Sequence, residues 1–438
     1  MAATLPFIYT PHPVIGLSPE ALDKYIVGDD PDTGKPVIDE IIKVLTKTDG
    51  KKEGKTEAPV LAQVAPPPAL LEPDTEDNLQ RLFYEKGWTD GLPIILPTEE
   101  RVQKMLTGTS ASPDEIAAES FSFATREMVK YTVEHVAVIA VMAGARPEYF
   151  PVILATAATR QSSLMPSITS FESMLLVNGP IRNEIDMNCG IGAFSAVNMA
   201  NSVIGRAWTL MSICHGFAKP RSTLWSSQGN NHTYNNMCAG ENEERSVWEP
   251  FHVGKGFKAD ESVVSVFRGW VCSNSYGAAS KRSLIEELNI QLPAMPPLNS
   301  SATIIMDPLV AKNLKENEGY NTKQDFCRAI SENVKMPAGV FWKTDHIDML
   351  VASEAYKGVE PYASWKKVPD DELIAPYHNP DNINIIVIGG ETGPFWKATD
   401  YGHWGSQSID RWRALPADGE CEDGTCGLPD DVTDADYD

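Results

Sequence analysis

Two cysteines four residues apart, Cys421 and Cys426, lie in a C-terminal segment rich in acids, glycine and proline. No Lys or Arg follows Arg413, so this segment repels itself and cannot build a core. A disulfide between the two thiols would close so short a loop that it stabilises by only about 2 kcal/mol. A structural zinc needs four ligands, of which the pair supplies two. The pattern therefore favours redox chemistry, with metal binding as an alternative.

A redox-active tail needs a thiol in the body of the protein with which to exchange. If extended, the chain from Trp412 to Cys421 reaches up to about 30 Å, which covers the radius of a domain of this size. Cys189, Cys238 and Cys272 are the candidates, because each lies in a polar setting that contains Gly or Ser. We choose Cys238, since an acidic cluster follows it directly.

Cys214 and Cys327 are expected to be ordinary core thiols. A body cysteine needs an accessible, polar environment to react, and most cysteines are inert.

The acidic cluster comprises Glu241, Glu243, Glu244, Glu249 and His252. If two of its carboxylates were buried together, one would hold a proton near neutral pH and act as an acid while the other acted as a base. We take Glu243, Glu249 and His252 as catalytic candidates. The alternative is a solvated acidic loop whose histidine packs on Trp248. A Glu/His metal site is also open, although no His-x-x-x-His spacing supports it.

Amide side chains and a guanidinium recur between residues 178 and 206, in otherwise small and apolar sequence. Such groups can hold a carboxylate, a carbonyl or a developing oxyanion. We predict substrate-binding roles for Asn178, Asn201 and Arg206. The alternative is helix capping and buried hydrogen-bond networks, the usual fate of single asparagines.

Two further segments are candidates for substrate binding. Gly389 and Gly390 follow a buried apolar run, where open α/β sheets place ligands and glycines can form an anion-binding nest. Asp90 lies in the stiff Gly87–Pro93 segment, whose sequence is Gly-Trp-Thr-Asp-Gly-Leu-Pro.

Helix and strand patterns alternate along the body that must position these residues. Helices are predicted over about 38–45, 98–108, 128–143, 147–158, 194–214 and 322–334. Strands are predicted over 174–177, 263–267, 303–306, 347–351 and 383–388. The fold class is therefore α/β, a layered mixed sheet flanked by apolar helices.

Composition suggests four regions. Residues 1–46 form an N-terminal arm, 47–75 a linker that changes from Lys/Gly/Glu to Ala/Pro, 76–412 the α/β catalytic body, and 413–438 a flexible acidic tail. The formal charge of -23 argues against nucleic acid as a partner. Residues 1–14 have no basic start and no apolar core, and no run of eighteen apolar residues occurs. We therefore expect a cytoplasmic protein with no membrane partner.

The body resembles a little-characterised family through its Trp88–Pro93 sequence, Trp-Thr-Asp-Gly-Leu-Pro. That family is related to the UGSC selenoprotein group. Further similarity lies in segments 138–151, 177–181, 204–206 and 241–252, so the resemblance spans roughly residues 80 to 410. Some members carry a selenocysteine-Gly-Ser-Cys segment. The resemblance implies that the tail thiols of this chain could substitute for it.

The tail itself, Asp418 to Cys426, resembles the C-terminal swinging arm of the ribonucleotide reductase large subunit. In that enzyme a Cys-x4-Cys pair passes electrons from thioredoxin or glutaredoxin to a buried active-site disulfide. The resemblance implies a thioredoxin-like reductant as partner.

These patterns predict an enzyme, a thiol/disulfide-dependent oxidoreductase that acts on a small organic substrate and is recharged through Cys421 and Cys426. No cofactor is predicted, and a homo-oligomeric state is left open. One alternative is a lyase or hydrolase with Glu/His acid-base chemistry, with or without a metal. Another is a protein that binds or delivers soft metal ions.

Overall fold

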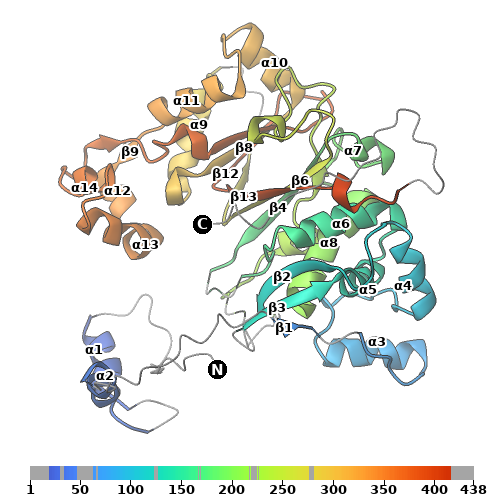
Figure 1. Ribbon diagram of the computed structural model, residues 1–438. Helices are drawn as coiled ribbons and strands as arrows, with labels where there is room; N and C mark the ends of the chain where they lie inside the picture. The colour runs from blue at the N-terminus through green and yellow to red at the C-terminus, as the bar shows by residue number, and fades with distance from the viewer. Residues whose placement is uncertain are drawn as a thin grey trace, which may run out of the picture. The chain divides into compact units, whose positions relative to one another are not determined.

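The computed structural model describes residues 19–29, 34–46, 63–65, 68–122, 127–165, 167, 169–216, 218, 224, 226–275 and 281–415. The chain divides into two compact units, Met1–Ala62 and Gln63–Asp438. The small unit contains the helices α1 (Pro19–Val27) and α2 (Val37–Thr46), which contact each other. The remaining elements all belong to the large unit (Figure 1).

Two four-stranded mixed sheets form the centre of the large unit. The first sheet has the order β13-β6-β4-β5, and the second has the order β11-β8-β12-β7. The strands of the first sheet are β4 (Glu172–Asn178), β5 (Ala239–Gly240), β6 (Val263–Gly269) and β13 (Gly402–Ser408). Those of the second sheet are β7 (Cys272–Asn274), β8 (Ala302–Met306), β11 (Ile383–Val387) and β12 (Trp396–Thr399).

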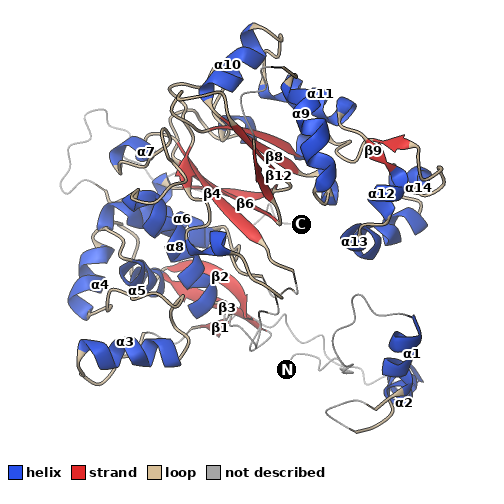
Figure 2. Ribbon diagram, turned by 180° about the vertical axis from the view of Figure 1, so that it is seen from behind, coloured by secondary structure: helices blue, strands red, loops and turns tan. Residues whose placement is uncertain are grey.

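Alternation along the strands shows how these sheets stack, because successive side chains of a strand point to opposite faces. In β4, Leu175 and Val177 pack into the cluster that contains the helices α5, α6 and α8. Met174 and Leu176 point the other way, into a cluster that includes Ile305 of the second sheet. The other face of the second sheet packs on α9, α10 and α11. The order is therefore helix, sheet, sheet, helix (Figure 2).

The helices that cover the sheets have clear local signals. Thr132 and His135 form a capping box at the start of α5, and Gly144 ends the helix with a φ of 86°. A second box, Thr322 with Asp325, starts α11. The helices are α3 (Glu76–Glu85), α4 (Glu99–Leu106), α5 (Val133–Ala143), α6 (Phe150–Ala158), α7 (Ile181–Glu184), α8 (Met199–Cys214), α9 (Leu284–Gln291), α10 (Pro308–Glu316) and α11 (Lys323–Asn333).

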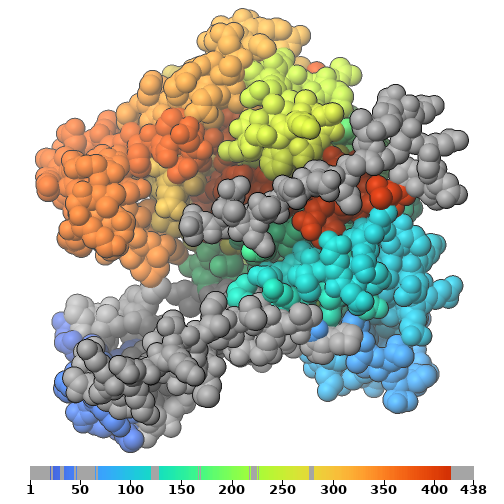
Figure 3. Space-filling view, viewed as in Figure 1, coloured from blue at the N-terminus to red at the C-terminus, as the bar shows by residue number. Residues whose placement is uncertain are grey.

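Two smaller assemblies complete the large unit. A three-stranded sheet has the order β1-β3-β2, from β1 (Gln63–Val64), β2 (Ile116–Ser122) and β3 (Glu127–Thr132). A helical group joins a strand pair with three helices around its own apolar cluster. Its elements are β9 (Met336–Pro337), β10 (Leu373–Ile374), α12 (Ala338–Trp342), α13 (Asp345–Tyr356) and α14 (Tyr362–Trp365). In Figure 3 the surface of α10 to α14, in orange, lies on one face of this unit.

The predicted α/β class is confirmed, and four of the five predicted strands correspond to β4, β6, β8 and β11. The predicted strand at 347–351 is wrong, because these residues lie in α13 and bury Ile347, Val351 and Ala355 with helical spacing. A short apolar run does not distinguish a strand from a buried helix. The helix expected from residue 128 begins at Val133, after β3, and the one expected from 194 begins at Met199.

The predicted linker 47–75 is structured in part, because Gln63 and Val64 pair in parallel with β3. None of the helices within the described residues combines the length and the apolar content that a membrane crossing requires.

Candidate active site

A polar pocket of about 580 Å³ opens beside the first sheet. Three segments line it, within residues 146–149, 184–190 and 197–200. They lie at the start of α6, the end of α7 and the start of α8. Cys189 is part of this lining, so we call the cavity the Cys189 pocket. Its volume is in the range of pockets that bind small molecules.

Asparagine side chains hold the loop that carries Cys189. The Asn188 side chain donates to the carbonyl of Ile191 at 2.9 Å and to Oδ1 of Asn198 at 2.8 Å. Asn201 accepts from the Asn188 N–H at 3.0 Å and donates to the Asn188 carbonyl at 2.9 Å. Asn201 was predicted to bind substrate, but it is buried and its amide is used to hold this loop. The amide side chains of Asn188, Asn198 and Asn201 thus fix the loop that lines the pocket.

Cys189 is partly exposed and has a guanidinium near it. A Cβ placed on Gly240 would lie 3.4 Å from Cys189 Cβ and 3.1 Å from Arg182 Cδ, so the two side chains are neighbours. Burial raises the pKa of the Cys189 thiol, while the positive charge of Arg182 acts to lower it. The thiol is therefore protonated at neutral pH, and the guanidinium is placed to stabilise a thiolate once one forms.

The last described part of the chain is fixed to a wall of this pocket. The Arg413 guanidinium donates twice to the carboxylate of Glu184, which lines the pocket, and at 3.0 Å to the Ser262 hydroxyl. Two residues later, the Leu415 N–H donates to the Ser110 hydroxyl at 2.7 Å. Cys421 and Cys426 lie outside the described residues.

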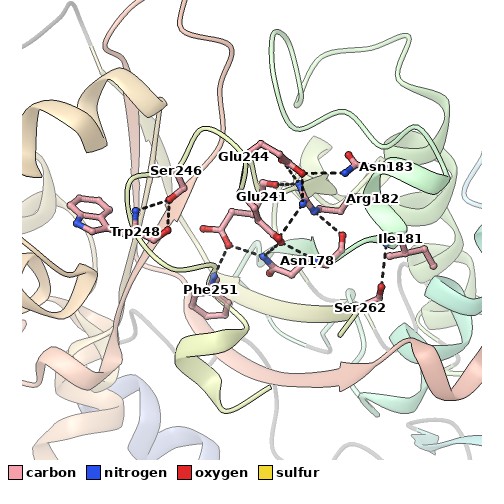
Figure 4. A network of polar contacts seen from close by, with 12 residues as sticks. Asn178, Ile181, Arg182, Asn183, Glu241, Glu244, Ser246, Trp248, Phe251 and Ser262 are labelled. Carbon is pink, nitrogen blue, oxygen red and sulfur yellow. Dashed lines mark hydrogen bonds and ion pairs between the residues drawn. The ribbon is translucent and has the colours of Figure 1, made fainter. Parts of the chain in front are cut away.

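Three members of the acidic cluster, Glu241, Glu243 and Glu244, join a network with basic and amide groups (Figure 4). Glu241 is fully buried. Its carboxylate accepts from the Asn178 amide at 2.7 Å, the Phe251 N–H at 2.6 Å, the Val387 N–H at 3.3 Å and the Lys323 ammonium at 2.7 Å. These donors come from β4, β11, α11 and the loop after Trp248, so one carboxylate joins the ends of both sheets.

Arg182 is the centre of the neighbouring part of the network. Its buried guanidinium forms ion pairs with Glu243 and Glu244, each at 3.0 Å. Glu243 also accepts from the Asn178 amide and the Gly179 N–H, both at 2.8 Å. Burial acts to raise the pKa of Glu244, but the hydrogen bonds from Arg182 and Asn183 outweigh it and lower that pKa to about 2. Glu244 is thus held as a charged group, and both carboxylates are engaged by hydrogen bonds.

The other members of the predicted acid–base set are not brought together. Glu249 is exposed. His252 is fully buried, and neither ring nitrogen has a hydrogen-bond partner among the described residues. Glu243 is engaged by Arg182 and Asn178. This arrangement does not place an acid and a base on a common open surface.

Cys238 lies in the core on the helix side of the first sheet and is only 1% exposed. Its Cβ packs against Gly205 of α8, where an added Cβ would approach it to 3.0 Å and would collide with the carbonyl of Asn235. Burial raises the pKa of Cys238 to about 12. This placement argues against the predicted catalytic role of Cys238, and Cys189 is the better placed body thiol.

Asp90 and Arg206, two predicted substrate contacts, bind each other. Arg206 donates through Nε at 2.8 Å and through one terminal nitrogen at 3.0 Å to the Asp90 carboxylate. The same guanidinium donates to the Pro93 carbonyl at 2.8 Å. The Trp88–Pro93 segment is therefore fastened to α8, and both charged groups are used within the fold.

Gly389 and Gly390 do adjoin the Cys189 loop. The Gly389 N–H donates to the Cys189 carbonyl at 3.1 Å, and Gly390 packs directly against Ile191. The sequence thus identified a real neighbour of the pocket, while missing Arg182 and Lys323. Arg182 has a weak signal, since it follows β4 closely and the acids of 241–244 need a cation. Lys323 has no comparable signal in the sequence, because its contact with Glu241 spans 82 residues.

Among the described residues, no group of three or more His, Cys, Asp or Glu side chains is placed to hold a metal ion. The fold and the pocket define the class of protein, a four-layer α/β protein with an accessible thiol in a polar cavity. Comparison with protein-family models, curated proteins and solved structures finds no match for this chain.

Proposed function

We propose that this protein is a thiol-dependent oxidoreductase that acts on a small polar organic substrate in the Cys189 pocket and is recharged through Cys421 and Cys426. The observation that carries the proposal is the position of Cys189. It lines a pocket large enough for a small molecule, whereas Cys238 and Cys327 are buried. Cys272 is partly exposed, but burial raises its pKa to about 11.

Two features support reactivity at Cys189. The Arg182 side chain lies beside the thiol. The first residues of the sixteen-residue helix α8 line the same pocket, and the positive end of a helix dipole favours a nearby thiolate.

The attachment of the chain near Leu415 supports recharging by the tail. Arg413 is paired with Glu184 on the pocket wall, so the tail starts beside the cavity. From Leu415 to Cys421 there are six residues, which reach up to about 20 Å when extended.

The chemistry balances without a bound cofactor. The Cys189 thiolate displaces a heteroatom group X from the substrate R–X, which forms Cys189–S–R and X⁻. One tail thiolate attacks the Cys189 sulfur, and R, whose carbanion is stabilised by a carbonyl group of the substrate next to the reacting carbon, leaves with the electron pair and takes up a proton to give R–H. The second tail thiolate then releases Cys189 and closes the Cys421–Cys426 disulfide, which a thioredoxin-like dithiol reduces with two electrons and two protons.

Disulfide mapping tests the proposal without knowledge of the substrate. In the Cys426→Ser variant, limited oxidation with diamide is expected to trap a disulfide between Cys189 and Cys421. Cys272→Ser is the matched control, because it removes a partly exposed body thiol outside the pocket and should leave the trapped species unchanged. If neither tail cysteine links to Cys189 when its partner is replaced, the recharging step is refuted.

Two alternatives have less support. The acid–base alternative is weakened because Glu243 is paired with Arg182 and Glu249 is exposed to solvent. The metal-delivery alternative depends on the tail, outside the described residues, and metal analysis of the purified protein tests it.

A further inference from the structure

Arg268 is a buried cation that has no anion beside it among the described residues. It lies in β6, is 5% exposed, and among the described residues no carboxylate comes within 4.0 Å of its guanidinium. Within the part of the chain that the structure describes, its Nε has no hydrogen-bond partner. Burial lowers the pKa of Arg268 to about 10, so the group is still charged at neutral pH. A buried charge without a partner is strongly unfavourable, and proteins normally pair it.

The described groups that contact Arg268 do not satisfy all of the N–H donors of its guanidinium. One terminal nitrogen donates to the Ser162 carbonyl and, at 3.5 Å, to the Gln161 side-chain oxygen. Both residues follow α6 and line a small cavity of about 30 Å³ whose lining includes Arg160 and Glu119 but not Arg268 itself, so this cavity is not the space beside the guanidinium.

Trp404 covers the guanidinium from the other side. Its ring centre lies 4.8 Å from the central carbon of Arg268, and the residue is 51% exposed. Trp404 is the extra residue of a β-bulge, since His403 pairs with Phe267 and Gly405 with Val266. The bulge uses a φ of 144° at Gly405, which residues with a side chain rarely adopt. A β-bulge changes the direction in which a side chain points, and this bulge directs the ring of Trp404 toward Arg268.

We propose that Arg268 and Trp404 form a binding site for a small oxyanion, a carboxylate or a phosphate group, separate from the Cys189 pocket. The oxyanion accepts from the unused donors of the guanidinium and supplies the missing counter-charge. Arg suits this role because its planar fork matches carboxylate and phosphate oxygens. The half-exposed indole is the movable cover of the site and reports its occupancy.

Fluorescence titration tests the site. The full chain is titrated with sodium phosphate and, separately, with sodium acetate, against sodium chloride of equal ionic strength. The Trp404→Phe variant isolates the signal of Trp404 from the other nine tryptophans. We expect a saturable Trp404 signal with at least one of the two oxyanions, and the two titrations separate a phosphate site from a carboxylate site. In Arg268→Gln the apparent affinity should fall at least tenfold.

Arg411→Gln is the matched control. Arg411 also stacks on an indole, 4.7 Å from the ring centre of Trp412, but it is 67% exposed and paired with Glu115. It should leave the titration unchanged. A Trp404 signal no larger than that of the chloride control, or an Arg268→Gln response equal to that of the wild type, overturns the proposal.

The wild-type protein provides a second measurement if Arg268→Gln fails to fold. Phenylglyoxal modifies arginine side chains, and peptide mapping locates the modified residues. Protection of Arg268 by the oxyanion, with Arg411 modified equally in its presence and absence, supports the site. Modification of Arg268 that the oxyanions do not change, or no modification at all, overturns it.

Discussion

The Glu241–Lys323 pair provides a quantitative test of how the two sheets are held together. The ammonium and carboxylate are 2.7 Å apart, Glu241 is fully buried, and the Lys323 side chain is 13% exposed. Replacing Lys323 with Met leaves a buried carboxylate without its cation. Breaking a buried pair in this way costs about 3–5 kcal/mol. Since Asn178 and two backbone N–H groups still donate to Glu241, we expect the lower end, about 3 kcal/mol.

The measurement is the free energy of unfolding in urea. Lys343→Met is the matched control, because the Lys343–Asp370 pair has a similar distance of 2.6 Å but both side chains are 74% exposed. That change should cost less than about 1 kcal/mol.

The double variant Glu241→Gln/Lys323→Met removes both charges, so its cost should be smaller than the sum of the two single changes by at least about 1 kcal/mol. A Lys323→Met protein within about 0.5 kcal/mol of the wild type, or strict additivity of the two changes, would show that this pair does not join the sheets as argued.

Three further predictions concern other sites. Because burial raises the pKa of Cys189, the rate of its alkylation by iodoacetamide should keep rising above the pH at which a free thiol levels off; a plateau at or below that pH would contradict the assignment. The Glu172 hydrogen bond raises the pKa of His232, so the stability that His232 adds is fully present below its unfolded pKa of about 6.5 and is lost as pH rises through its folded pKa. Unfolding curves of His232→Gln should therefore differ most from the wild type near pH 6, and a difference that grows with pH would contradict this. Val197 is fully exposed with a φ of 73°, so Val197→Gly should raise the free energy of unfolding, by up to about 1 kcal/mol, and a loss of stability would show that this backbone is not strained.

Local patterns sufficed for much of the fold. Apolar runs predicted β4, β6, β8 and β11, and the Thr322–Asp325 box marked the start of α11. Patterning was insufficient at 347–351, where the apolar run belongs to a helix whose other side faces solvent. The spacing of apolar residues distinguishes a helix from a strand in a long segment, but a run of five residues is too short to show which spacing is present.

The site was less predictable than the fold. The sequence singled out Gly389 and Gly390, which adjoin the Cys189 loop, and it named Cys189 among three thiols, but it chose Cys238. That choice depended on Cys238 preceding an acidic cluster. In the structure Gly205 of α8 packs closely on Cys238, which is buried, while Arg182 and Lys323 pair with three carboxylates of the cluster. Neither contact is visible from residues that are adjacent in sequence.

The sequence by itself determined the α/β class, the helix caps, the candidate thiols and the acidic tail, since all of these depend on residue types within a few positions of one another. The tertiary structure decided which thiol faces a cavity, which charges pair with each other and which pocket residue Arg413 is attached to. Those outcomes depend on packing between distant segments, such as Arg413 against Glu184 and Arg206 against Asp90. Burial and ion pairing are properties of the assembled layers, and these decide whether a reactive group is available for chemistry.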